Sequence, residues 1–399
     1  QVLPVNPADG FGSPYAGLAA FAGDTGLLER PCGEVLEELH DIGNDPDYQE
    51  FCENNEYWLR PYCTFCALKE LHGGAAWQDW PAADRRFSPA MAHDPRLTET
   101  AERARRLQFE FDREWRDLVD YAHGRGVMVI GDMPMFVSAD SADVWSEPDV
   151  FDLGDDGRPA RMAGAPGDAF APEGQLWGNP TYRWDVLRER GYDWWLRRLG
   201  RAMALYDYVR LDHFIGFSSY YAIPAGGTPA DGAYAYGPGA ELFEAAHAQF
   251  GPLPFVAEDL GMVTPAVRAL VAQTGIPGMD VVQFSDGDVR EGWQPRPGTV
   301  AYTGTHDNQT LVGFAASRLG AEGPDEAREL AERVMGNVLA SDADVAIVQL
   351  QDVLGLGDEA RMNVPGTAGG NWSWHADEAQ VQAAADHLRE LAREHGRLA

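Results

Sequence analysis

The chain of 399 residues is 45% hydrophobic and 24% charged. This composition fills a core and excludes disordered, collagen-like and simple fibrous proteins. Its 63 acidic and 31 basic side chains give a formal net charge of −32, which repels phosphate backbones and anionic membrane surfaces. We therefore expect no nucleic-acid or membrane partner, and a neutral ligand is favoured.

The positive charge comes almost entirely from arginine, since Lys69 is the single lysine. The large negative charge is explained by a salt-rich cytoplasm, as in a halophile. About 1 M salt shortens the Debye length to about 3 Å and so screens the repulsion between the protein's own negative charges. The alternative is an acidic protein from a GC-rich genome, in which arginine codons displace lysine codons. We expect a cytoplasmic location, because we find neither a run of ~20 apolar residues nor a secretion signal in this sequence.

Short β-branched runs alternate with longer amphipathic stretches, which is typical of βα repeats around a parallel sheet. Residues 6–110 hold no strand candidate, so we expect an inserted subdomain of loops and short helices there. This alternation predicts one decorated (β/α)8 TIM-barrel domain over residues 1–399. The predicted strands are residues 2–5, 127–132, 208–212, 255–258, 280–284, 301–305 and 345–350, and the main predicted helices are residues 99–125, 184–206, 326–339 and 377–395.

Acidic residues follow several predicted strands, at the barrel end where active sites lie. They are Asp132, Asp212, Glu258 and the pair His306-Asp307. Each alone is most often a helix cap or turn residue. Together they predict converging carboxylates, which suit either a metal site or glycosidic chemistry.

The metal alternative is the weaker one. Residues 152–157 half resemble a calcium loop, but the twelfth position is Ala163 rather than Glu. Cys63 and Cys66 lack a second cysteine pair for zinc, and we expect them to be small buried residues of a helix.

Glycosidic chemistry needs a nucleophile and an acid/base of different protonation. Arg210 lies two residues before Asp212 on one strand, so both point to the same side and the guanidinium keeps Asp212 ionised. Glu258 follows an apolar run that favours its protonated form, as leaving-group donation requires. Asp307 is then expected to hold sugar hydroxyls. The alternative is an Arg210–Asp212 ion pair that only braces the barrel.

Aromatic side chains in Gly/Pro-rich loops are candidate platforms for sugar rings, whose apolar faces stack on them. The tryptophans of the predicted helix at 184–206 are expected to lie in the core instead. The loop candidates are Tyr15, Phe170, Trp177, Tyr182, Trp372 and Trp374.

Seven stretches resemble stretches of a single family. They span nearly the whole chain and occur in the same order as in that family. They are QVLPVNPADGFGSPYAGLAAFAG (1–23), GDMPMFVSADSADVW (131–145), GAPGDAFAPEGQLWGNPTYRWDVL (164–187), YVRLDHFIGF (208–217), VAEDLGMVTP (256–265), AYTGTHDNQT (301–310) and LQDVLGLGDEARMNVPGTAGGNWSW (350–374). The family is that of the 4-alpha-glucanotransferases, or amylomaltases, family 77 of the glycoside hydrolases in the alpha-amylase clan.

The resemblance implies roles by position. Asp212 matches the nucleophile, Glu258 the acid/base and Asp307 the transition-state-stabilising aspartate. A loop at 164–180 covers bound glucan in the family. The positions expected to contact substrate are Tyr15, Asp132, Asp168, Phe170, Trp177, Arg210, His306, Asn363 and Pro365.

The implied reaction is retaining α-1,4 transglycosylation of glucans and maltooligosaccharides, with glucose as an acceptor and without metal or organic cofactor. The three carboxylates do not distinguish transfer from hydrolysis, so an α-glucan hydrolase stays an alternative. A second alternative is an inactive, truncated glucan-binding barrel. The sequence does not predict the oligomeric state.

The chain also departs from the family's pattern. Gln309 stands where we expect Asp, and His375 stands where we expect Arg. Residues 29–57 are shorter than the corresponding region. Seven strands are predicted where the barrel has eight, so the resemblance implies that the first strand and helix precede Val2 and are missing from this chain.

Overall fold

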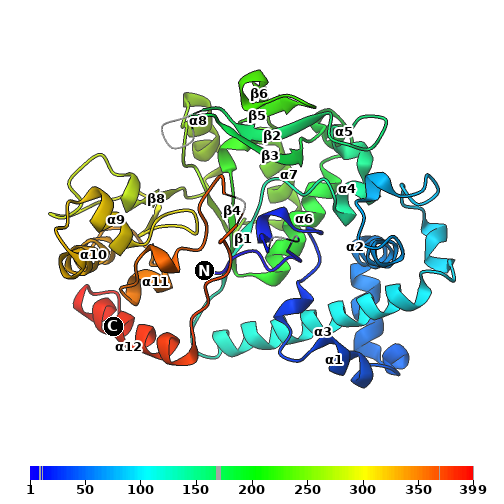
Figure 1. Cartoon of the computed structure of the whole chain (residues 1–399), viewed down its shortest axis with the longest axis horizontal. Helices are drawn as coiled ribbons and strands as arrows, with labels where there is room; N and C mark the ends of the chain where they lie inside the picture. Colours follow the sequence, from blue (N-terminus) through cyan, green and yellow to red (C-terminus); the bar gives the residue numbers. More distant parts are fainter. Residues whose placement is uncertain (9, 11, 168–171, 368, 399) are drawn as a thin grey trace. The chain divides into compact units, whose positions relative to one another are not determined.

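The computed structural model describes residues 1–8, 10, 12–167, 172–367 and 369–398 (Figure 1). Contacts divide the chain into two compact units, Gln1–Phe255 with Pro265–Thr274 and Val256–Thr264 with Gly275–Ala399. Both contain helices and parallel strands, so the fold is mixed α/β, as expected. The helices and strands of the first unit are α1 (Cys32–Glu38), α2 (Pro46–Leu71), α3 (Thr98–His123), β1 (Ile130–Met133), α4 (Ala142–Ser146), β2 (Arg161–Ala165), β3 (Gln175–Pro180), α5 (Trp184–Glu189), α6 (Asp193–Leu205), β4 (Tyr208–Leu211), β5 (Ser219–Pro224), β6 (Ala233–Tyr236), α7 (Glu241–Phe250) and α8 (Pro265–Thr274).

A parallel strand pair carries the first group of candidate residues. β1 pairs with β4 in a register that sets Asp132 opposite Arg210. Val209 and Leu211 of β4 are fully buried, so the burial of apolar side chains fixes the strand and leaves Arg210 on its other face. The sheet order is β1-β4-β7, in which β7 is Phe255–Ala257.

The prediction of a strand at residues 2–5 is wrong, although the backbone there lies beside β1. The N–H of Val2 donates to the carbonyl of Ile130, and the carbonyl of Val5 accepts from Asp24. Pro4 has no N–H to donate, so a regular ladder does not form. The strand predicted at 127–132 begins three residues later, at Ile130.

A four-stranded antiparallel sheet was not predicted. Its order is β3-β2-β5-β6, and its strands lie at Arg161–Ala165, Gln175–Pro180, Ser219–Pro224 and Ala233–Tyr236. Gly164, Gly178 and Ala-rich segments give these strands few β-branched side chains, which removes the usual sequence signal. This sheet carries the second half of the segment predicted to cover glucan.

The inserted region at 6–110 contains helices and, among its described residues, no strand. Its helices are not all short, because α2 spans 26 residues. Asp45 caps α2 by accepting hydrogen bonds from two backbone N–H groups. Cys63 is buried in α2 and Cys66 is partly buried there, and burial raises the pKa of Cys66 to about 11. The prediction of a buried helical cysteine is confirmed for Cys63, whereas Cys66 lies in the helix but is only partly buried.

The long predicted helices form, with one interruption. The stretch 184–206 splits into α5 and α6 because the chain turns at Gly191 and Tyr192, both in the left-handed region. Trp194 and Trp195 of α6 are buried, as expected.

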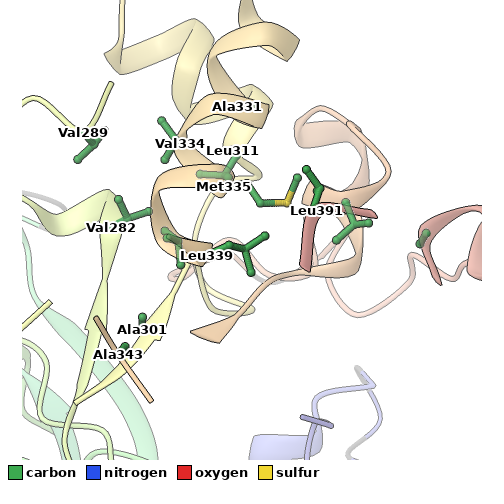
Figure 2. Close-up of a cluster of buried hydrophobic side chains, with 13 residues drawn as sticks. Val282, Val289, Ala301, Leu311, Ala331, Val334, Met335, Leu339, Ala343 and Leu391 are labelled. Atoms are coloured by element: carbon green, nitrogen blue, oxygen red, sulfur yellow. The ribbon is translucent and has the colours of Figure 1, made fainter. Parts of the chain in front are cut away.

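The second unit is built around a short parallel sheet of order β10-β9-β8. Figure 2 shows a core cluster of this unit, to which Val282, Ala301, Val334, Met335 and Leu339 all belong. The predicted strands at 280–284 and 345–350 end early, since a 3-10 turn and a helix take over their last residues. The helices and strands after β7 are β8 (Met279–Val281), β9 (Val300–Tyr302), α9 (Leu311–Arg318), α10 (Pro324–Leu339), β10 (Ala346–Ile347), α11 (Leu350–Val353) and α12 (Glu378–Glu394).

Candidate active site

Four predicted residues meet in the first unit. Nη1 of Arg210 lies 2.7 Å from Oδ2 of Asp132 and 2.9 Å from Oδ1 of Asp212. The hydroxyl of Tyr15 donates to Oδ2 of Asp132 at 2.7 Å. Arg210 and Asp132 are buried, whereas the side chain of Asp212 is 25% exposed. One buried cation therefore faces two carboxylates, of which only Asp212 is open to solvent.

Tyr15 acts here as a hydrogen-bond donor. Burial, reinforced by the charge of Asp132, raises the pKa of Tyr15 well above its ordinary value. Its proton therefore stays in place at neutral pH and holds one oxygen of Asp132, while Arg210 contacts both of them.

A ring cluster lies beside Asp212. The ring of His213 is 5.0 Å from that of Trp177, edge to face, and 6.2 Å from that of Phe136. His213 has φ 50°, and burial lowers its pKa despite the opposing charge of Asp212. A neutral imidazole is thus placed next to the candidate nucleophile, and Trp177 leaves 38% of its surface exposed.

Two predicted substrate contacts, Asp168 and Phe170, lie outside the described residues. The described parts of the segment 164–180 form the end of β2 and all of β3. Trp177 lies on β3 and donates through Nε1 to Oε1 of Gln175 at 3.0 Å. This segment therefore contributes one aromatic ring that the structure places in the first unit.

Glu258 belongs to the second unit and follows β7 directly. Its side chain is almost buried, at 9% exposed, and Oε1 accepts a hydrogen bond from the N–H of Leu260 at 3.0 Å. The next residue, Asp259, is 2% exposed and pairs with Arg296 at 2.8 Å. Glu258 is therefore held in a tightly hydrogen-bonded turn.

Three further predicted residues meet in the second unit. Asn363 donates from Nδ2 to Oδ1 of Asp307 at 2.6 Å, and its N–H donates to the carbonyl of His306 at 3.0 Å. Arg361 donates to the carbonyl of Asp307 at 2.5 Å and to the carbonyl of Asn363 at 2.8 Å. The loop after β9 is thus joined to the loop before residue 364, and Asp307 keeps 48% of its side chain exposed.

The other residues of the second unit that the sequence analysis singled out lie in different surroundings. Trp372 has a backbone φ of 60°, and the centroid of its ring lies 5.6 Å from that of His306. Pro365 is exposed in a turn. Gln309 donates to Asp358 at 2.7 Å and accepts from Ser317 at 3.1 Å, so it has a defined place in the loop.

Sequence reasoning missed His213, Phe136 and Arg361 as members of these groups. His213 follows Asp212 directly, and that adjacency was the available signal. Arg361 lies two residues before Asn363, but its contact with Asp307 spans 54 positions, and no local pattern reveals such a contact.

Among the described residues, no group of three or more His, Cys, Asp or Glu side chains is arranged to hold a metal ion. None of the helices in the described part of the chain combines the length and apolarity that a membrane crossing requires.

Comparison with known proteins agrees with the resemblance seen in the motifs. The family model described as 4-alpha-glucanotransferase matches residues 26–380. The 4-alpha-glucanotransferase of Streptococcus pneumoniae is 35% identical, over 97% of this chain and 87% of that protein. The enzyme of the same name from Thermus thermophilus is 38% identical, over 94% and 86%.

A solved structure of similar fold is the amylomaltase from Streptococcus agalactiae in complex with acarbose. It is 31% identical, with a TM-score of 0.87 over 99% of this chain and 91% of that one. The family match covers most of the chain, and both relatives exceed 30% identity. The chain belongs to glycoside hydrolase family 77, the 4-alpha-glucanotransferases.

Proposed function

We propose that this protein transfers segments of α-1,4-glucan from a donor maltooligosaccharide to the 4-hydroxyl of an acceptor glucan or glucose, with retention of configuration. Family membership supports transfer over hydrolysis and over a binding-only role. The observation that carries the chemistry is the 2.9 Å contact between Arg210 Nη1 and Asp212 Oδ1, since it sets a solvent-accessible carboxylate beside a buried cation.

In the first step, Asp212 attacks the anomeric carbon and forms a β-linked glycosyl-enzyme. Glu258 gives its proton to the glycosidic oxygen, and the shortened donor leaves. Asp307 holds sugar hydroxyls and favours the distorted ring of the transition state, with Asn363 and Arg361 keeping its loop in place.

In the second step, Glu258 takes the proton of the acceptor 4-hydroxyl, and the acceptor oxygen displaces Asp212. Tyr15, Asp132, Arg210 and His306 contribute polar contacts around the reacting sugar. Trp177 supplies an aromatic face to the glucan, and Asp168, Phe170 and Pro365 add contacts at its edges.

We also propose an architecture and a cellular setting for this protein. The parallel strands β1, β4, β7, β8, β9 and β10 form parts of one (β/α)8 barrel, in a single catalytic domain over residues 1–399. The protein acts in a salt-rich cytoplasm, and the net charge of −32 supports this setting.

Incubation with maltotriose tests the function. A transferase produces glucose together with maltopentaose and longer chains, whereas a hydrolase produces only shorter sugars and a binding protein produces none. Adding ¹³C-labelled glucose then tests the acceptor, because label enters the lengthened chains only if glucose accepts a glycosyl group. Absence of any product longer than maltotriose would overturn the proposal.

A further inference from the structure

An ion pair whose carboxylate is buried immediately follows the candidate acid/base. Asp259 is 2% exposed, and its two carboxylate oxygens accept from Nη1 and Nη2 of Arg296 at 2.8 and 3.2 Å. Oδ1 also accepts from the N–H of Met279 at 2.9 Å. Bidentate pairing fixes both the place and the rotation of a carboxylate.

Arg296 is itself held from several sides. Its Nε lies 2.8 Å from Oδ1 of Asp280, its own N–H donates to Oδ2 of Asp280 at 2.5 Å, and Nη2 donates to the carbonyl of Met279 at 2.9 Å. The guanidinium is therefore a pre-arranged fork rather than a loose surface charge, although half of the side chain is exposed.

The turn that carries Glu258 leaves little freedom between it and Asp259. The N–H of Asp259 donates to the carbonyl of Ala257 at 3.0 Å, and the N–H of Leu260 donates to Glu258 itself. Gly278 lies so close to the Asp259 carboxylate that an added Cβ would be 2.6 Å from its oxygens. A displacement of the Asp259 main chain would therefore carry with it the backbone of Glu258, the preceding residue.

We propose that Arg296 is a positioning residue that, through Asp259, sets the direction in which the Glu258 carboxyl delivers its proton to the glycosidic oxygen. The proposal rests on the acid/base role given to Glu258 under the proposed function. Arg296 touches neither substrate nor reacting atoms in this role. Its effect is confined to steps that need proton transfer, because it acts on the orientation of one carboxyl group.

The test compares two donors in the full chain carrying Arg296→Gln. Maltotriose needs a proton for its leaving oxygen, whereas fluoride leaves α-maltosyl fluoride without one. The value of kcat/KM for fluoride release covers only the steps up to fluoride departure. It therefore does not depend on the orientation of the Glu258 carboxyl group. We expect kcat/KM for maltotriose to fall at least tenfold, mainly through kcat, and kcat/KM for fluoride release to change less than about threefold.

Two further variants keep the result interpretable if Arg296→Gln folds poorly. Arg296→Lys restores the charge but not the two-pronged pairing, so it recovers part of the maltotriose activity. Gly278→Ala leaves residue 296 unchanged but crowds the Asp259 carboxylate, so we expect the same selective loss. The matched control is Arg290→Gln, because Arg290 forms a similar pair with Asp288 in the same segment of chain and is expected to leave both donors unaffected.

Equal losses with the two donors, or full maltotriose activity in Arg296→Gln, would overturn the positioning role. Failure of the proposed function gives a different result, since the unmodified protein then fails to lengthen maltotriose in the same assay.

Discussion

Arg210 and Asp132 form an ion pair in which almost nothing is exposed to water, with 4% and 1% of their side chains accessible and Nη1 at 2.7 and 2.8 Å from the two carboxylate oxygens. The same nitrogen reaches Asp212 at 2.9 Å. One buried cation therefore contacts two carboxylates, and one of them, Asp212, is the proposed nucleophile.

The first prediction concerns Arg210→Met. This change leaves the buried Asp132 carboxylate without its cation, and breaking a buried pair from one side costs about 3–5 kcal/mol. We expect the free energy of unfolding in urea to fall by that amount. Adding Asp132→Asn to the same chain removes the uncompensated charge, so the double variant should be more stable than the single one. Equal midpoints for the two would refute this electrostatic account.

The second prediction concerns Asp212→Asn. The amide has the size of the carboxylate but cannot form the glycosyl-enzyme, so we expect kcat for maltotriose transfer to fall by at least about 10³-fold. Binding of maltotriose, measured by calorimetry, should change little, because the nucleophile acts mainly in the transition state.

Asp149→Asn is the matched control, since Asp149 forms an exposed pair with Arg86 and lies in no candidate group. Substantial residual transfer by Asp212→Asn, beyond what reversion or contamination explains, would remove Asp212 from the nucleophile's role.

The sequence predicted the part of the site that rests on strand geometry. Residues two apart on a strand share a face, which placed Arg210 beside Asp212 correctly, and parallel pairing then set Asp132 opposite Arg210. Helices with strong amphipathic patterns, such as α3 and α10, were also found, with bounds within two residues.

Contacts between distant loops were not predictable in the same way. The hydrogen bond from Asn363 to Asp307 and the pair between Arg296 and Asp259 join positions 56 and 37 residues apart. The partners depend on how loops fold back, which no local period encodes. The antiparallel sheet was not predicted for a different reason. Its Gly- and Ala-containing strands lack the β-branched alternation that marks a half-buried strand.

The third prediction concerns pH and a carboxyl group in the second unit. Asp352 is buried and accepts from the N–H of Leu311 at 2.6 Å and the hydroxyl of Thr303 at 2.7 Å, yet burial raises its pKa to about 6. The folded state therefore binds this proton more tightly than the unfolded state, whose pKa is near 3.8. Its contribution to stability is complete below about pH 4 and is lost as the pH rises through 6.

Comparison with Asp352→Asn isolates this contribution from all other titrating groups. The free energy of unfolding of the unmodified protein, minus that of the variant, should fall by on the order of 2–3 kcal/mol between pH 4 and pH 7. Urea unfolding at closely spaced pH values measures it. A difference that stays constant, or that grows with pH, would show that Asp352 is not held protonated by its surroundings.

The last prediction concerns salt, where two effects of opposite sign compete. Salt weakens the many exposed Arg–carboxylate pairs, but each is worth about 1 kcal/mol at most. Salt also screens the repulsion of a net charge of −32, in which 63 acidic groups face 31 basic ones. Because the excess of like charge is as large as the whole basic complement, repulsion dominates, and the thermal midpoint and transfer activity should both rise from roughly 0.1 M to roughly 1 M KCl. Sucrose of equal osmolality controls for general exclusion effects, since it stabilises without screening. A flat response to KCl would instead favour codon composition as the origin of the acidic, arginine-rich chain.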